Sequence, residues 1–136
     1  MKCLATGLFA LMACTTSSIA QSAIVSGTGD QLLGTYAAYI GVDDLHNSQG
    51  QRLSQAWQII RQDRANFHRF GIRDRGDESD SFFASADNRA AMEQMLRQGQ
   101  ISSGAAREIV NGDVFIQVEI YGRGNVGSSV YVTTFR

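Results

Sequence analysis

The sequence contains no proline, and both of its cysteines and its only lysine lie within the first 14 residues. Removal of these residues as a signal peptide would leave a chain without a thiol for disulfide bonds and without a thiol or lysine nucleophile. Without proline there is no proline-rich linker, and we find no internal repeat that divides the chain. A length of 136 residues therefore predicts one domain that depends on its hydrophobic core alone.

The charge balance lacks the excess of positive charge that nucleic-acid binding requires. Beyond residue 20, eleven arginines oppose thirteen aspartates and glutamates, which gives a formal charge of −2. A dedicated nucleic-acid-binding domain is distinctly basic, so we expect no nucleic-acid partner. The balance still permits a local cluster of arginines on one surface.

The first 20 residues have the pattern of a secretory signal peptide. Lys2 provides the positive start, residues 4–13 form an apolar run, and small residues precede Gln21 at the expected cleavage site. The apolar run is too short to span a bilayer as a mature helix. We therefore expect cleavage before Gln21 and a periplasmic or secreted protein.

A second processing site competes with the first. The run Leu11-Met12-Ala13-Cys14 resembles the lipobox of bacterial lipoproteins. The resemblance implies that Cys14 becomes the acylated first residue and anchors the protein in a membrane, because several acyl chains bind a bilayer stably. A membrane is an expected partner only in this case, and the sequence leaves both alternatives open.

Residues 54–71 form the longest predicted helix, which we expect to organise the core. Large or apolar side chains recur at the helical period, with Arg64 completing their stripe. Ser54 is a suitable N-cap, and Gly71 can adopt the left-handed conformation that ends a helix. The apolar members of the stripe are Ala56, Trp57, Ile60, Phe67 and Phe70.

The remaining segments predict further helices and an N-terminal strand. Turn-forming residues mark the boundaries, and apolar periodicity distinguishes strand from helix. In chain order we expect a flexible lead-in at residues 21–34, a strand at 35–42, an exposed charged loop at 72–80, a helix at 87–98 capped by Asp87, and a short helix at 102–110 capped by Ser102 or Ser103.

The C-terminal part predicts a β-hairpin. Val114, Ile116, Val118 and Ile120 alternate with more polar residues, a turn is expected at 122–127, and a second alternating strand follows at 128–135. A hairpin alone is unstable in water, so we expect the strand at 35–42 to join it. The fold class is therefore α+β, with a small antiparallel sheet packed against about three helices in a single domain spanning residues 35–136.

Four arginines on and after the longest helix are the candidate residues for binding a ligand or partner. Arg61, Arg64 and Arg69 fall within the helix and Arg73 follows it. Guanidinium groups bind carboxylates and phosphates through paired hydrogen bonds, so such a surface suits an anion. The alternative is pairing within the chain, with the nearby acids Asp63, Asp74, Asp77 and Glu78.

The two histidines and two neighbouring aspartates are the candidates for catalysis or metal binding. Asp44 stands two residues before His46 and could orient its imidazole as a general base. His46 and His68, at the two ends of the long helix, could share a metal ion, although their spacing matches no known metal motif. The alternative is that both histidines are structural residues.

From these observations we expect an exported, non-catalytic module of the bacterial cell envelope. It would bind a partner protein or an anionic polymer of the envelope through its arginine-bearing helix. The alternative is a small periplasmic hydrolase or metal-dependent enzyme that uses His46 and His68 with Asp43 or Asp44. We expect no cofactor, because the G-x-G-x-x-G pattern of residues 122–127 precedes a predicted strand and not the helix that dinucleotide binding needs.

Overall fold

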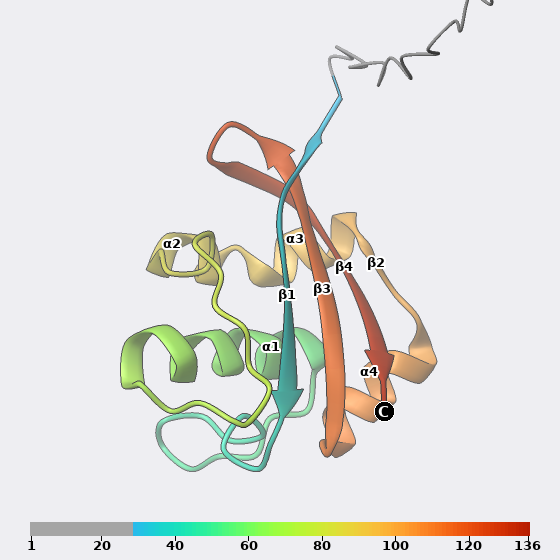
Figure 1. Ribbon diagram of the computed structural model, residues 1–136. Coiled ribbons are helices and arrows are strands. Elements are labelled where there is room, and N and C mark those ends of the chain that lie inside the picture. Colours follow the sequence, from blue (N-terminus) through green and yellow to red (C-terminus); the bar gives the residue numbers. More distant parts are fainter. Residues whose placement is uncertain (1–28) are drawn as a thin grey trace, which may run out of the picture.

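The computed structural model describes residues 29–136, which form a four-stranded sheet covered by helices (Figure 1). The predicted signal peptide, the lipobox at Cys14 and most of the predicted lead-in lie outside the described residues. Within residues 29–136, no helix is both long and apolar enough to cross a membrane. The elements are β1 (Gln31–Ile40), α1 (Ala56–Ala65), the π-helix η1 (Asn66–Phe70), α2 (Ala86–Ala90), α3 (Met92–Gln98), β2 (Gln100–Ile101), α4 (Ser103–Asn111), β3 (Val114–Arg123) and β4 (Val126–Phe135).

The sheet has the strand order β1-β3-β4-β2, which confirms the α+β prediction of a C-terminal hairpin joined by an N-terminal strand. β3 lies between its two antiparallel neighbours, so that Val118 faces Tyr36 of β1 and Val132 of β4. The short strand β2 was not expected, and it runs parallel to β4. The sheet is therefore mixed, and two residues are too few for β2 to show a period in the sequence.

The helices lie on one side of the sheet and enclose a single core (Figure 1). Alternate residues of β3 are buried beneath them, as the period-2 pattern predicted. The opposite face of the sheet carries a row of aromatic rings, in which Phe115 packs between Tyr39 and Phe135 with ring centroids 5.1 and 5.4 Å apart. The main buried side chains of the core are Tyr36, Ala38, Ile40, Ile59, Ile60, Phe83, Met92, Met95, Ile109, Val114, Ile116, Val118, Ile120, Val130 and Val132.

The predicted long helix is present, but its start and its last turn differ from expectation. It begins at Ala56 with Gln55 as the N-cap residue, and the Gln58 side chain accepts hydrogen bonds from the Ser54 and Gln55 amides at 3.3 and 3.2 Å. Ser54 is therefore not the cap. The last five residues form the π-helix, which ends as predicted at Gly71 with a φ of 69°.

The boundaries of other helices and strands also differ from those predicted from the sequence. The helix expected at 87–98 is two helices, α2 and α3, and its cap is Ser85, whose hydroxyl accepts a hydrogen bond from the Asn88 amide. The predicted Ser102 cap of α4 is confirmed by a 3.0 Å bond from the Ala105 amide. β1 starts at Gln31, within the expected lead-in, and the hairpin turn is confined to residues 124–125.

The charged loop at residues 72–80 covers part of the outer edge of β1. The Ala37 amide donates to the Glu78 carboxylate, and the Glu78 amide donates to the Ala37 carbonyl, both at 2.8 Å. The Tyr39 amide donates to Asp77 Oδ1 at 2.9 Å. These carboxylates therefore satisfy backbone groups of an edge strand. The alternative in which the acids pair with the arginines does not hold for Asp77 and Glu78, which form no ion pair with another of residues 29–136.

Candidate functional site

Arg64 is the most deeply buried of the candidate residues, with a relative exposure of 0%. Its Nε lies 2.7 Å from Asp63 Oδ2, and its Nη1 lies 3.1 Å from Asp80 Oδ2 and 2.9 Å from the Glu78 carbonyl oxygen. A buried guanidinium is tolerated only when its donors are paired in this way. The expectation that Arg64 contributes to a binding surface is therefore wrong, because its charge is used inside the protein.

Aromatic rings complete the surroundings of this guanidinium. Its Cζ atom lies 4.1 Å from the ring centroid of Tyr36 and 4.7 Å from that of Phe67. Burial raises the pKa of Asp63 to about 7, against the attraction of Arg64. Burial likewise raises the pKa of Tyr36 well above its usual value. The arrangement is an internal ion-pair cluster that joins α1, β1 and the loop before α2.

His68 belongs to the same cluster. Its Nε2 lies 3.0 Å from Asp80 Oδ2, the oxygen that also contacts Arg64. The other oxygen of Asp80 accepts a 2.5 Å hydrogen bond from the Phe83 amide. The Asp80 carboxylate is thus held by three donors, and His68 covers it at the protein surface with only 11% of its side chain exposed.

Asp44 is also buried, and it fastens the loop after β1 to the π-helix. Its Oδ2 accepts a hydrogen bond from the Gly41 amide at 3.0 Å, and its Oδ1 accepts one from Asn66 Nδ2 at 2.8 Å. Burial raises the pKa of Asp44 to about 6, although both hydrogen bonds oppose the rise. His46 contacts the Val42 carbonyl through Nδ1 at 3.1 Å, so Asp44 does not orient its imidazole.

The structure does not bring the four predicted catalytic or metal-binding residues together. Asp43 and His46 line a surface hollow, Asp44 is buried under the loop, and His68 contacts Asp80. Within residues 29–136 no group of three or more His, Cys, Asp or Glu side chains is placed to hold a metal ion. The geometry therefore offers neither the Asp44–His46 pair nor a site shared by the two histidines.

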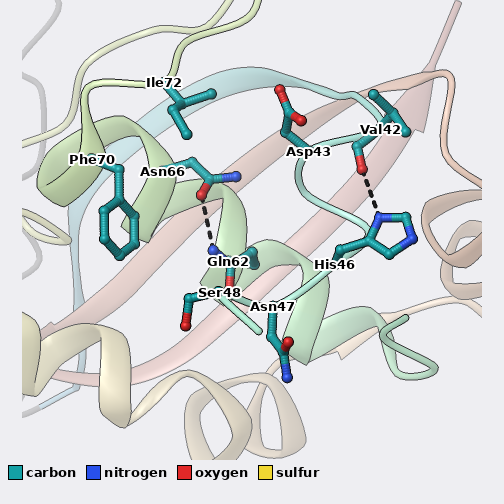
Figure 2. A pocket seen from close by; sticks show the side chains of 9 residues that line it. All are labelled: Val42, Asp43, His46, Asn47, Ser48, Gln62, Asn66, Phe70 and Ile72. Atoms are coloured by element: carbon teal, nitrogen blue, oxygen red, sulfur yellow. Dashed lines mark hydrogen bonds between the residues drawn. The ribbon is translucent and has the colours of Figure 1, made fainter. Parts of the chain in front are cut away.

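The hollow that contains His46 has a volume of about 440 Å³ and lies between the loop after β1 and the end of the π-helix (Figure 2). Phe70 and Ile72 stand at one side and Val42 at the other, with exposures of 45%, 44% and 71%. Between them, Gln62 donates a 2.9 Å hydrogen bond to Asn66. Three of the seven large apolar side chains exposed in residues 29–136 thus line one hollow.

A second hollow, of about 310 Å³, adjoins the first along α1. Trp57, Arg61, Ala65 and Arg69 line it at intervals of four residues, so they form one ridge of the helix. The two hollows share Asn47, Ser48, Gln62 and Phe70, and we call the two adjoining hollows together the α1 groove.

The two arginines of the α1 groove carry uncompensated charge. Arg61 and Arg69 are both exposed, and neither forms an ion pair with another of residues 29–136. The Arg69 guanidinium lies 5.0 Å from the ring centroid of Phe70. Arg73 lies outside the groove, with its guanidinium 4.1 Å from the Phe67 ring. Of the four candidate arginines, the structure therefore brings only Arg61 and Arg69 together.

The apolar side of the groove was not foreseen from the sequence. The predicted stripe assigned both Phe67 and Phe70 to the core, but only Phe67 is buried. A π-helix has a wider turn than an α-helix, so residues three apart no longer share a face, and such turns are frequent at functional sites. Asn66, buried and held by Asp44, is the residue at which the change of helix begins.

Comparison with known proteins adds no relative from which an activity could be transferred. The chain matches no protein-family model, no curated protein and no solved structure.

Proposed function

We propose that the protein is an exported, non-catalytic module of the cell envelope that binds an anionic partner through the α1 groove. The observation that carries the proposal is that Arg61 and Arg69 line one hollow beside Trp57 without an ion-pair partner among residues 29–136. Export follows from the predicted signal peptide, which precedes the described residues.

Two guanidinium groups in one depression suit the binding of an anion. Arginine remains charged at any physiological pH and presents a fork of donors that matches a carboxylate or a phosphate. The nearby rings of Trp57 and Phe70 provide flat surfaces on which a guanidinium or a ligand can stack. A concave surface that combines aromatic rings with a few polar groups is typical of binding sites.

The interior of the protein supports a binding role more than a catalytic one. Asp44, Asp63 and Asp80 are the buried carboxylates of the described residues, and each is engaged by internal donors. The groups that remain exposed in the α1 groove are arginine, amide, hydroxyl and apolar side chains, together with Asp43 and His46. These groups recognise a ligand through charge and contact.

The proposal can be tested with the only tryptophan of the chain, because Trp57 lies in the groove. The protein would be produced from the full sequence, purified after export and titrated with polyglutamate while Trp57 fluorescence is recorded. We expect saturable binding that weakens with salt and is lost in the double variant Arg61→Gln/Arg69→Gln.

The matched control is Arg75→Gln/Arg107→Gln, which removes the same charge from two exposed arginines that line neither hollow and form no ion pair with another of residues 29–136. This variant should bind polyglutamate as the unmodified protein does. Equal loss in both variants would show a dependence on net charge only, and undiminished binding in the groove variant would place the anion site elsewhere.

A further inference from the structure

We infer that the α1 groove binds an extended acidic peptide segment of a partner protein, with one large apolar side chain of that segment seated in the first hollow. The inference rests on the proposed function and names the chemical class of its ligand. It requires a ligand that carries negative charge and an apolar group a short distance apart, because the two hollows adjoin and differ in chemistry.

The first hollow provides the apolar half of the site. Val42, Phe70 and Ile72 are all exposed there, and they come from two segments that face each other across it (Figure 2). Exposed apolar side chains that gather on one part of a surface mark an interaction site more often than scattered ones do. A Leu-sized or Phe-sized side chain placed between them would remove apolar surface from water on both partners.

The second hollow provides the charged half. Arg61 and Arg69 stand two helical turns apart on the same ridge, and Phe70, against which Arg69 lies, is common to both hollows. An extended chain with acidic side chains beside the apolar one can place carboxylates near both guanidinium groups. Charge complementarity of this kind sets the orientation of a bound segment.

Polar groups on the boundary between the two hollows suit a peptide backbone. Gln62 uses its amide nitrogen to bind Asn66, which leaves its carbonyl oxygen available as an acceptor. The Ser48 hydroxyl lines both hollows as well. A peptide offers amide donors and carbonyl acceptors along its whole length, so these two side chains can bond its main chain.

The same features disfavour the other anionic partners. A polyphosphate or an acidic polysaccharide has no apolar side chain, and it would leave Val42, Phe70 and Ile72 in water. A lipid would place an acyl chain in the first hollow, beside the Asp43 carboxylate and the Gln62 carbonyl oxygen, and unlike a peptide main chain an acyl chain offers these acceptors no hydrogen-bond donor. Burying such groups in an apolar medium is costly unless they find partners.

The test compares N-acetylated, C-amidated peptides by Trp57 fluorescence. The peptide EELEE carries the proposed combination, EEAEE lacks the apolar side chain, and KKLKK reverses the charge. We expect EELEE to bind about tenfold more tightly than EEAEE, which corresponds to about 1.4 kcal/mol. KKLKK should not bind, and Arg61→Gln/Arg69→Gln should abolish binding of EELEE.

A second pair of variants tests whether the apolar side chain of the peptide binds in the first hollow. Ile72→Ser should remove the preference for EELEE over EEAEE, while Val126→Ser, which changes a more exposed apolar residue next to the hairpin turn, should retain it. Circular dichroism and the thermal midpoint would show that each variant is folded.

The outcomes separate the inference from the proposed function. If EELEE and EEAEE bind equally, or neither binds, while polyglutamate binds in an Arg61- and Arg69-dependent manner, the inference is overturned and the proposed function stands. Binding to phosphatidylglycerol vesicles but to no peptide would overturn the inference in favour of a lipid. If the unmodified protein binds none of these anions, both the inference and the proposed function are overturned.

Discussion

Arg64 and Asp80 form an ion pair inside the protein, with 3.1 Å between Nη1 and Oδ2 and almost no exposure of either side chain. The pair joins α1 to the end of the loop at residues 72–80, whose acidic residues also bond the edge of β1. A loop that the sequence marks as charged and exposed is thereby attached at one end to the core. Removing Arg64 would leave the buried carboxylate of Asp63 without a charged partner.

We predict that Arg64→Met destabilises the protein by about 3–5 kcal/mol, because Asp63 and Asp80 then lose the charge that compensates them. Urea unfolding followed by circular dichroism measures the change in the free energy of unfolding. The control is Arg61→Met on the exposed side of the same helix, which should change stability by no more than about 0.5 kcal/mol. Equal effects of the two substitutions would contradict the internal role of Arg64.

The raised pKa of Asp44 predicts a pH dependence of stability. Burial raises this pKa to about 6, whereas an unfolded aspartate titrates near about 3.9. The folded protein therefore holds the Asp44 proton more tightly than the unfolded chain does. The contribution of this proton to the free energy of unfolding is complete below about pH 4 and is lost as the pH rises through about 6. The expected loss is roughly 2–3 kcal/mol at about 1.4 kcal/mol per pKa unit.

Asp44→Asn should remove this part of the pH dependence, since the amide does not titrate. We expect the substitution to lower stability at every pH, because an amide cannot accept both hydrogen bonds from Gly41 and Asn66. The informative quantity is therefore the slope of the unfolding free energy between about pH 4 and about pH 8. If the unfolding free energies of Asp44→Asn and of the unmodified protein change with pH in parallel, the raised pKa of Asp44 is disproved.

Tyr36→Phe is predicted to stabilise the protein. The Tyr36 hydroxyl is buried and has no hydrogen-bond partner among the described residues. An unpaired buried hydroxyl costs about 1–3 kcal/mol, so its removal should raise the thermal midpoint. Tyr39→Phe is the contrasting variant, because it removes a hydroxyl that donates to Asp113 and should lower the midpoint. A lower midpoint for Tyr36→Phe would reveal a partner for that hydroxyl.

Two glycine-to-alanine substitutions should have opposite effects on the free energy of unfolding. A Cβ atom on Gly99 would lie 1.7 Å from the Val130 carbonyl oxygen, so Gly99→Ala must displace backbone where β2 approaches β4. We expect a loss of about 3 kcal/mol, because the clash is with backbone and not with a flexible side chain. Gly104, within α4, has only Ser102 Oγ near its Cβ position, at 3.7 Å. Gly104→Ala should therefore gain about 0.5–1 kcal/mol of helix propensity in the same unfolding assay.

The elements predicted best are those whose pattern is local. The alternation from Val114 to Ile120 is a property of one strand, and it predicted which side chains face the core. Gly71 ends its helix because the required conformation is accessible to glycine, and Ser102 caps α4 through its own hydroxyl. The period-3.6 pattern included Arg64 in the stripe that the structure buries, although the sequence prediction also assigned Arg64 to the binding surface.

The candidate site was predicted only in part, because its parts come from distant segments. Asp44 and Asn66, 22 residues apart, fasten the loop after β1 to the π-helix and so form one side of the groove. No local pattern signals that bond, nor the change to a π-helix that leaves Phe70 exposed. Arg61 and Arg69, which the sequence marked as candidate binding residues, do line the groove; that they bind a partner stays a prediction.

The sequence by itself determined the fold class and most helix and strand positions, because these follow from periodicity, turn residues and caps within each segment. The tertiary structure alone decided which charged side chains form buried ion pairs and which remain exposed on the surface. Asp80 and Tyr36 reach Arg64 from outside its helix, and their contacts decide that Arg64 is structural while Arg61 and Arg69 remain exposed. Ion pairing depends on distances in space, which the order of residues along the chain does not contain.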